Sequence, residues 1–446
     1  MKILTLAYYG TFSRYFRYLE KNICEINPKV SFFNVSIYPS AHLFWKENNE
    51  HSVFLPHEIR KIEVTDITEI GETYNNISIV NVMRYHLQLL KIKQNTPEYN
   101  YLKLNAIRYI EYFDNLFKTH KFDIFICSGD SRLFVEIAVI IAKKYNVKIC
   151  FFEQGPYNTT IIDEQGVNAN SSFRTSFLKD QKCNDDGSVE KFINRKKSPK
   201  FYKDNYKYYI YKILDLIYLS PPIKNIFPID LITESNFTNL FIRNIKRTIF
   251  KKSKTDQTIE IPEKSILLIL QVPYDVQMIY NSPLFSNFSE MVEIVHKSIP
   301  VGWNLIIREH PLFINSYDKD MYSYIKNNDI LIINNMPLDE MIRKSEVVVV
   351  NNSTVGLEVL VHYKPLVILG DCYYDNHGVG YKVNSIDEIK IKIEEAIRSA
   401  VPRDKIDIFL YNLFFEYLFE GHFQDKNLKS GRKIAQFILS RFYGQA

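Results

Sequence analysis

The residues of this chain whose types and spacing could do chemistry stand at the ends of short apolar runs or in the turns that follow them. Asp275 follows the run 265–270, and Glu153 follows the run 147–152. A carboxylate in such a place can act as a nucleophile, as a base or as a helix N-cap, and spacing alone favours the cap for Asp275. Two carboxylates that face each other, one ionised and one protonated, would serve retaining glycosyl transfer, for which their separation is decisive.

A second candidate is the segment Val350–Glu358, which follows an apolar run and opens a helix. Ser353 or Asn352 can cap this helix, and Gly356 allows another backbone to approach. The free N–H groups at the helix start would then bind an anion, and Glu358, about one turn later, would accept a hydrogen bond from a ribose hydroxyl. The alternative is an ordinary capped helix.

A third candidate combines Arg308 and His310, which stand before Pro311 at the end of the run 304–307. Residues two apart on a strand share a face, so both side chains are expected to point the same way. Together they would hold a phosphodiester, Arg308 through its planar fork and His310 as a donor or acid. A histidine beside a proline can instead be structural.

These residues need a sheet that brings strand ends together at one edge. Apolar, β-branched runs alternate with helical periodicity in both halves of the chain, which is typical of parallel βαβ units. Ligands bind such sheets at the carboxyl ends of the strands. The turn 128–131 therefore places Gly129 and Asp130 at the binding edge of the N-terminal half, where we expect them, with Asn168, on the acceptor side.

We predict an α/β fold of two Rossmann-like domains facing a cleft, the architecture called GT-B among glycosyltransferases. Residues 1–190 would form the acceptor-side domain and residues 259–400 the nucleotide-sugar domain. Residues 191–258 would form a basic, helical insertion rich in Tyr and Lys, and helices in 401–446 would pack back on the N-terminal domain. A fold alone does not define a function.

Composition and charge narrow the classes of protein. The chain has 446 residues, of which 46% are hydrophobic and 24% charged, so a disordered or fibrous protein is excluded. Its net charge of +5 is uneven, because residues 191–254 hold 15 Lys and Arg against 4 Asp and Glu, a net +11 that leaves −6 elsewhere. This local region predicts docking on an anionic membrane surface or an acidic glycan. No recognised nucleic-acid-binding module accompanies it, so we expect no nucleic acid partner.

Cysteines and hydropathy indicate the compartment. The five cysteines are odd in number and scattered, as expected for reduced thiols of a cytoplasmic protein: Cys24, Cys127, Cys150, Cys183 and Cys372. The N-terminal residues are typical of a first strand rather than a signal peptide. No apolar run approaches the roughly 20 residues that span a bilayer, so we expect membrane contact to be peripheral, on the inner face of the cytoplasmic membrane.

Several motif classes find no support. The chain has no G-x-G-x-x-G, P-loop, H-E-x-x-H or G-x-S-x-G, which argues against dinucleotide-binding, NTPase, zincin and α/β-hydrolase functions. Asp318-Lys-Asp320 matches the Asp-x-Asp metal motif of another glycosyltransferase class, but it lies in a polar loop with no strand before it. We therefore expect no metal there.

In combination, the motifs resemble the bacterial capsule polysaccharide synthesis family, which includes the retaining β-Kdo glycosyltransferases of capsule and lipopolysaccharide assembly. The resemblance covers roughly residues 150–385 and rests on the order of the motifs at strand ends. The matching segments are Glu153-Gln-Gly with Asp163 and Gly166-Val-Asn168, Gln271-Val-Pro-x-Asp275, Arg308-x-His310-Pro311, and Asn352-Ser-Thr-Val-Gly-Leu-Glu358 with Lys364-Pro365.

The resemblance implies an enzyme that moves Kdo from CMP-Kdo to a glycan or glycolipid acceptor with retention, without a cofactor and without a divalent metal at the catalytic centre. It implies Asp275 as the nucleophile and Glu153 as the acid/base. The residues implied to bind CMP are Gln271, Arg308, His310, Asn352, Ser353, Thr354 and Glu358. The family often has Lys before the His-Pro pair, and Arg308-Glu309 departs from that pattern.

Two alternatives remain open at the level of sequence. The phosphate site is generic, so the donor could be CMP-sialic acid or a UDP- or GDP-sugar. The chain could also be a non-catalytic factor for polysaccharide assembly or export, in which case the basic segment would be the active surface and Asp275 would be dispensable.

Overall fold

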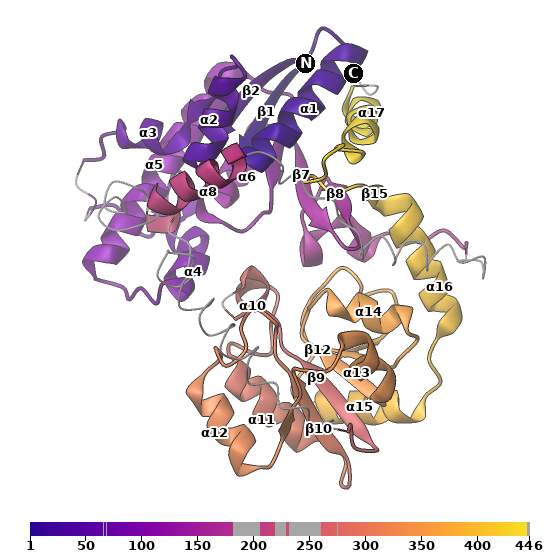
Figure 1. The fold of residues 1–446 in the computed structure, drawn as a ribbon. Coiled ribbons are helices and arrows are strands. Elements are labelled where there is room, and N and C mark those ends of the chain that lie inside the picture. The colour runs from indigo at the N-terminus through magenta and orange to yellow at the C-terminus, as the bar shows by residue number, and fades with distance from the viewer. Residues whose placement is uncertain are drawn as a thin grey trace. The chain divides into compact units, whose positions relative to one another are not determined.

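The computed structural model describes residues 1–65, 67, 69–181, 206–218, 229–231, 260–273 and 275–443. The chain forms two compact units (Figure 1). Unit 1 comprises Met1–Val167, Glu190–Ile242 and Tyr417–Ala446, and unit 2 comprises Asn168–Val189 and Arg243–Glu416. The chain therefore passes between the units more than once, and each unit has its own sheet.

The sheet of unit 1 is parallel through its centre and antiparallel at one edge. Its strand order is β15-β8-β7-β6-β1-β2-β3, and β8 and β15 run antiparallel to their neighbours. The strands are β1 (Lys2–Ala7), β2 (Ser31–Ser36), β3 (Val53–Phe54), β6 (Ile124–Ser128), β7 (Lys148–Gly155), β8 (Thr159–Asp163) and β15 (Phe419–Glu420); β4 (Thr73–Tyr74) and β5 (Ile77–Ser78) form a separate hairpin.

Helices cover both faces of this sheet (Figure 1) because its central strands are apolar on both sides. Leu4 and Leu6 of β1 face one core, and Ile3 and Ala7 face the other. The first core includes residues of α4 (Ile79–Leu89), α5 (Pro97–His120) and α6 (Leu133–Lys144), and the second includes residues of α1 (Gly10–Ile26), α2 (Pro39–Glu47) and α17 (Ser430–Phe442). The short helix α3 (Leu55–Arg60) follows β3.

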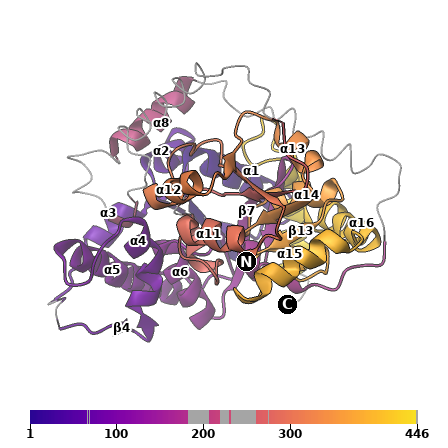
Figure 2. The ribbon, with the colours of Figure 1, turned by 90° about the horizontal axis from the view of Figure 1, so that it is seen from below.

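Two described parts of the basic insertion dock on unit 1. Helix α8 (Tyr206–Tyr218) lies beside α2 (Figures 1 and 2), where the buried carboxylate of Asp215 accepts a hydrogen bond of 2.9 Å from the backbone N–H of Ser40. The short 3₁₀ turn η5 (Ile229–Leu231) is held at Asp230 and Leu231 by the hydroxyls of Tyr109 and Tyr38, respectively. The rest of the +11 segment, like Cys183, lies outside the described residues.

The sheet of unit 2 is parallel throughout, in the order β11-β10-β9-β12-β13-β14. Its strands are β9 (Ser265–Ile269), β10 (Asn304–Arg308), β11 (Leu331–Ile332), β12 (Val347–Val350), β13 (Leu366–Ile368) and β14 (Tyr381–Lys382). Its helices are α10 (Val276–Tyr280), α11 (Phe288–Ser298), α12 (Lys319–Asn327), α13 (Leu338–Lys344), α14 (Val355–Val361), α15 (Glu388–Arg398) and α16 (Arg403–Tyr411), followed by the π-helical η6 (Asn412–Tyr417).

The predicted α/β fold with two Rossmann-like units is confirmed, including a helix in the insertion and a C-terminal return to unit 1. The points of division differ from those expected. Segment 168–181, with the 3₁₀ turns η1 (Asn168–Asn170) and η2 (Ser172–Thr175), belongs to unit 2, because Arg174 grips the buried carboxylate of Asp375 with two hydrogen bonds of 2.8 Å. The return to unit 1 begins at Tyr417 rather than at residue 401.

Candidate active site

The strands β9, β10 and β12 of unit 2 are neighbours and parallel, so their carboxyl ends meet at one edge. Gln271 and Asp275 follow β9, His310 follows β10, and Asn352 follows β12. Arg308 is the last residue of β10. The structure thus gathers the predicted nucleotide-side residues at the same sheet edge, although they are far apart in sequence.

Two buried amides at this edge have unused hydrogen-bonding capacity. Gln271 and Asn352 are each only 6% exposed, and the Gln271 Oε1 accepts a weak bond of 3.5 Å from the Asn352 N–H. The Asn352 Nδ2 donates to the carbonyls of Gln277 and Asn281. Within the described residues, the Gln271 Nε2 and the Asn352 Oδ1 find no partner. Since buried polar groups are nearly always paired, a donor and an acceptor left over at a strand edge favour a ligand-binding site.

The side chain of Asp275 does not serve the structural role that spacing favoured. Asp275 is the N-cap residue of α10, and its carbonyl accepts from the N–H groups of Met278 and Ile279, but its carboxylate makes no capping hydrogen bond. The spacing-based expectation of a cap is therefore wrong for the side chain. A carboxylate in this place is compatible with the nucleophile role that remains a prediction.

Arg308 and His310 bind different neighbours rather than a shared point. Arg308 donates to the Met336 carbonyl at 2.6 Å and approaches the Met341 Sδ at 2.7 Å. The His310 Nδ1 accepts from the Leu312 N–H at 3.3 Å. Burial lowers the pKa of both side chains. A neutral His310 whose Nδ1 accepts carries its proton on Nε2, which leaves that nitrogen as the donor.

Glu309, between these two residues, is a structural residue of the β10 end. It is 2% exposed, and its carboxylate accepts from the Asn315 N–H, the Tyr322 hydroxyl and the Asn334 Nδ2. The buried Glu309 carboxylate is therefore satisfied by three neutral donors and needs no cation beside it.

Helix α14 differs from the predicted capped helix. Thr354 is its N-cap, with helical backbone angles and no capping side chain, while the Ser353 Oγ accepts only from the Val355 N–H at 3.3 Å. Asn352 does not cap either, because its Oδ1, the acceptor that a cap would use, has no partner among the described residues. A Cβ on Gly356 would lie 2.3 Å from the Tyr374 hydroxyl, so Gly356 admits a tyrosine side chain and not the predicted backbone. Glu358 lies in the first turn and acts electrostatically on Arg308.

In unit 1, Glu153 does not end its strand. Strand β7 continues to Gly155 and turns through Tyr157 and Asn158, both at positive φ, into the antiparallel β8, so that Glu153 pairs with Ile161. The Glu153 carboxylate accepts from the Gln154 N–H at 2.8 Å and acts electrostatically on Tyr8. Glu153 therefore lies in a strand, close to the end of β1.

The three residues expected on the acceptor side divide between the units. Gly129 and Asp130 follow β6 in unit 1, where Gly129 has φ +70° and faces open space. The Asp130 carboxylate accepts from the Val167 N–H at 3.3 Å. Asn168 belongs to unit 2, which corrects its expected place in the N-terminal domain. Asp163 of the matching pattern orders the turn after β8 by accepting from Gln165 and Gly166.

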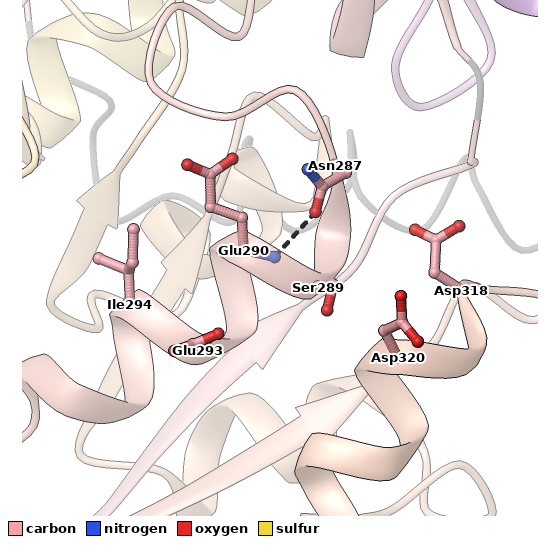
Figure 3. Close-up of a pocket in the computed structure, with 7 residues that line it drawn as sticks. All are labelled: Asn287, Ser289, Glu290, Glu293, Ile294, Asp318 and Asp320. Atoms are coloured by element: carbon pink, nitrogen blue, oxygen red, sulfur yellow. Dashed lines mark hydrogen bonds between the residues drawn. The ribbon is translucent and has the colours of Figure 1, made fainter.

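A pocket of about 550 Å³ lies elsewhere in unit 2, between the N-terminal parts of α11 and α12 (Figure 3). Four acids dominate its lining, which comprises Asn287, Ser289, Glu290, Glu293, Ile294, Asp318 and Asp320. Such a surface repels the phosphates of a nucleotide, so it is no candidate for the donor site.

In the part of the chain that the structure describes, no group of three or more His, Cys, Asp or Glu side chains could hold a metal ion. No helix among the described ranges is long and apolar enough to cross a membrane.

Curated relatives include proteins that are named for capsule polysaccharide export and modification. The chain is 29% identical to the capsule polysaccharide export protein KpsS of Escherichia coli over 136 residues, which are 28% of this chain and 34% of KpsS. It is 26% identical to the capsule polysaccharide modification protein LipB of Neisseria meningitidis serogroup B over 298 residues, which are 60% of this chain and 68% of LipB. The chain thus matches only about a third of KpsS.

Solved structures with similar folds include the KpsC beta Kdo 2,7 transferase of Thermosulfurimonas dismutans, at 11% identity and a TM-score of 0.36, with 76% of this chain and 95% of that chain covered. The UDP-GlcNAc 2-epimerase of Methanocaldococcus jannaschii has 14% identity and a TM-score of 0.33, with 99% and 100% covered. Residues 123–419, more than half of the chain, match the family described as "Capsule polysaccharide biosynthesis protein". The chain therefore belongs to the capsule polysaccharide biosynthesis protein family.

Proposed function

We propose that this protein is a retaining glycosyltransferase that moves Kdo from CMP-Kdo to a glycan or glycolipid acceptor in capsule or lipopolysaccharide assembly. Family membership supports a role in capsule formation. The observation that carries the enzyme proposal is made at the edge of unit 2. Asp275, whose carboxylate makes no capping hydrogen bond, follows the same strand as Gln271, whose buried amide has an unused donor. The choice of Kdo rests on the motifs that resemble the β-Kdo transferases.

The proposed reaction has two displacements. In the first, an oxygen of the Asp275 carboxylate forms a bond to the anomeric carbon while the bond from that carbon to the CMP phosphate breaks, and CMP leaves with the electron pair. In the second, Glu153 takes the proton of an acceptor hydroxyl, whose oxygen attacks the same carbon and releases Asp275. Two inversions at one carbon give net retention.

The departing CMP carries the developing negative charge. The His310 Nε2–H and the Arg308 guanidinium are proposed to stabilise that charge, together with backbone N–H groups at Ser353 and Thr354. The unused Gln271 Nε2 and Asn352 Oδ1 would bind polar atoms of the donor, and Glu358 would accept from a ribose hydroxyl. Because α14 is a seven-residue helix, aimed groups rather than a helix dipole would supply most of the stabilisation. Neither a cofactor nor a divalent metal enters the proposed mechanism.

The decisive experiment supplies CMP-Kdo generated in situ together with candidate acceptors, and measures both product and intact enzyme by mass spectrometry. The proposal expects a Kdo-sized mass increase on the enzyme that maps to Asp275, and a product with the retained configuration. Turnover of a UDP- or GDP-sugar or of CMP-sialic acid in place of CMP-Kdo would contradict the donor assignment. Comparing CMP, UDP and GDP by thermal shift tests the same point independently.

A non-catalytic assembly or export factor is the second candidate, because the relative KpsS is named an export protein. This candidate expects acidic polysaccharide to bind without any turnover of CMP-Kdo, and it expects an Asp275→Asn variant to support capsule formation in cells as well as the unchanged protein does.

We further propose that α8 rests on an anionic membrane surface. One side of α8 docks on unit 1 through Asp215 and Lys207, the latter paired with Glu47 at 2.9 Å. The other side exposes apolar residues at helical spacing: Tyr209, Ile210, Ile213 and Ile217, with exposed fractions of 55%, 46%, 54% and 47%. The net +11 of residues 191–254 complements an anionic lipid, and an interfacial helix buries such a face among the headgroups.

Vesicle flotation tests this docking. Ile213→Asp combined with Ile217→Asp should reduce binding to vesicles of phosphatidylcholine and phosphatidylglycerol by about tenfold or more. Ile391→Asp in unit 2, at an equally exposed isoleucine, is the matched control and should bind as the unchanged protein does. The membrane assignment would be overturned if the protein bound pure phosphatidylcholine vesicles as well as the anionic ones. It would also be overturned if the protein were a dimer and the double variant a monomer.

A further inference from the structure

Arg132 stands at the carboxyl edge of the sheet of unit 1, in a position that the sequence motifs did not single out. It directly precedes α6 and follows the turn after β6, which lies between β1 and β7 in the parallel part of the sheet. This edge corresponds in unit 1 to the place where parallel α/β sheets bind ligands. The neighbouring Gly129 faces open space, so the turn does not close the edge.

The guanidinium of Arg132 is set among tyrosines. It lies 5.5 Å from the centre of the Tyr8 ring, and it interacts electrostatically with the hydroxyls of Tyr8, Tyr9, Tyr38 and Tyr85. The Tyr9 and Tyr38 rings are stacked, with centres 4.6 Å apart. The cation–π contact uses the face of the Tyr8 ring and leaves the N–H donors of the guanidinium available.

No described residue accepts a hydrogen bond from the Arg132 guanidinium, and no described carboxylate lies within 4.0 Å of it. Other arginines of the chain do have such partners: Arg17 pairs with Glu50, Arg174 with Asp375, and Arg441 with Glu164. An arginine is seldom buried without a carboxylate, because five donors then lose water without replacement. Arg132 is partly exposed, so the N–H donors of its guanidinium are accessible to a ligand at the sheet edge.

The carboxylate of Asp230 interacts electrostatically with Arg132 but forms no ion pair with it. Its Oδ2 accepts from the Tyr109 hydroxyl at 3.1 Å. Burial raises the pKa of Asp230 to about 7 despite the opposing influence of Arg132. A group that is partly protonated at neutral pH neutralises a neighbouring cation incompletely.

We propose that Arg132 binds the carboxylate or phosphate of the acceptor, at the edge where Tyr9 is partly exposed and Tyr8 is buried behind the guanidinium. The planar fork of arginine matches both anions with two parallel hydrogen bonds. That the bound anion belongs to an acceptor rests on the proposed function, whereas the anion site itself does not. Glu153, assigned the acceptor proton, acts on the same Tyr8, so the anchor and the base share one neighbourhood of unit 1.

Direct binding to the full chain tests this site without any turnover. The probes are the methyl glycoside of Kdo, its uncharged carboxyl methyl ester, and methyl phosphate, each titrated by NMR. The site expects one or both anions to bind and the ester to bind at least about tenfold more weakly than the acid. Binding of the acid alone assigns a carboxylate, and binding of methyl phosphate alone assigns a phosphate.

Variants then locate the binding. Arg132→Gln should weaken the anion that binds by at least about tenfold, whereas Arg132→Lys keeps the charge and should lose less. Arg441→Gln, which removes a surface arginine of the same unit, should bind as the unchanged protein does. Equal affinity of ester and acid, or anion binding that Arg132→Gln leaves unchanged, overturns the site. Thermal midpoints confirm that the variants fold, and the ester comparison requires no variant at all.

The outcome is separable from the proposed function. If CMP-Kdo is never turned over but the anion binds through Arg132, the transferase proposal fails and the site stands. If transfer proceeds with an unchanged KM for an acidic acceptor in Arg132→Gln, the site fails and the transferase stands.

Discussion

The two sheet edges of this molecule are built from similar strands but present different chemistry. At the edge of unit 2, buried amides of Gln271 and Asn352 have unused capacity, and the cation Arg308 already donates to a backbone carbonyl. At the edge of unit 1, the cation Arg132 lacks a hydrogen-bonding partner among the described residues and lies against tyrosines. The first edge combines neutral amide groups with a cation that is already hydrogen-bonded, whereas the second presents a cation whose donors have no partner among the described residues.

The largest effect is expected from Asp275→Asn at the edge of unit 2. If Asp275 forms the bond to the anomeric carbon, the amide should lower kcat by about 1,000-fold or more, since the variant lacks the nucleophile. Affinity for CMP should stay within about twofold, because the change is isosteric and the carboxylate makes no capping bond. Steady-state transfer and calorimetric titration with CMP measure the two quantities.

Asp318→Asn is the matched control for this variant. Asp318 is also an N-cap residue without a capping side-chain bond, and it lies in unit 2 beside the acidic pocket. Transfer by this control should be unchanged. Near-normal turnover by Asp275→Asn would remove the catalytic role from the edge of unit 2.

A smaller effect is expected from His310→Ala. Loss of the Nε2–H should weaken CMP binding by about tenfold, the value of one hydrogen bond to a charged group. His296→Ala, at another histidine of unit 2 whose pKa is lowered by burial, should leave CMP affinity unchanged. If both variants bind CMP like the unchanged protein, the phosphate contact lies elsewhere on this edge.

Much of the scaffold could be predicted because local patterns define it. The apolar run 265–270 is a strand up to Ile269, and the runs at 304–307 and 347–350 are its neighbours. Their alternation with helices fixes a parallel sheet, and a parallel sheet brings Asp275, His310 and Asn352 to one edge. The candidate site of unit 2 follows from these local signals.

What could not be predicted depends on partners distant in sequence. Gly356 was assigned to a backbone approach, but its neighbour is Tyr374, which a local pattern cannot identify. Glu153 was expected directly after its strand, whereas the strand continues to Gly155 and turns at Tyr157 and Asn158, which have positive φ. Arg132 matters because it has no hydrogen-bonding partner among the described residues, which only the folded unit can reveal.

The smallest effect concerns how unit 1 holds its insertion. Asp215 is 6% exposed, and burial raises its pKa from 3.8 to about 6. The folded state thus favours the protonated form, so its contribution to stability is complete below pH 3.8 and is lost as the pH rises through 6, by at most about 3 kcal/mol.

Asp215→Asn keeps an oxygen to accept from the Ser40 N–H and carries no charge. Urea unfolding should show similar free energies for the variant and the unchanged protein at pH 3.5, and a more stable variant at pH 7. Asp114→Asn, which removes the ion pair with Lys144 at the surface, should show no such gain at pH 7. A variant that is less stable than the unchanged protein at pH 7 would mean that the ionised Asp215 carboxylate itself anchors α8, and unit 1 would then rely on charge in its scaffold as well as at its binding edge.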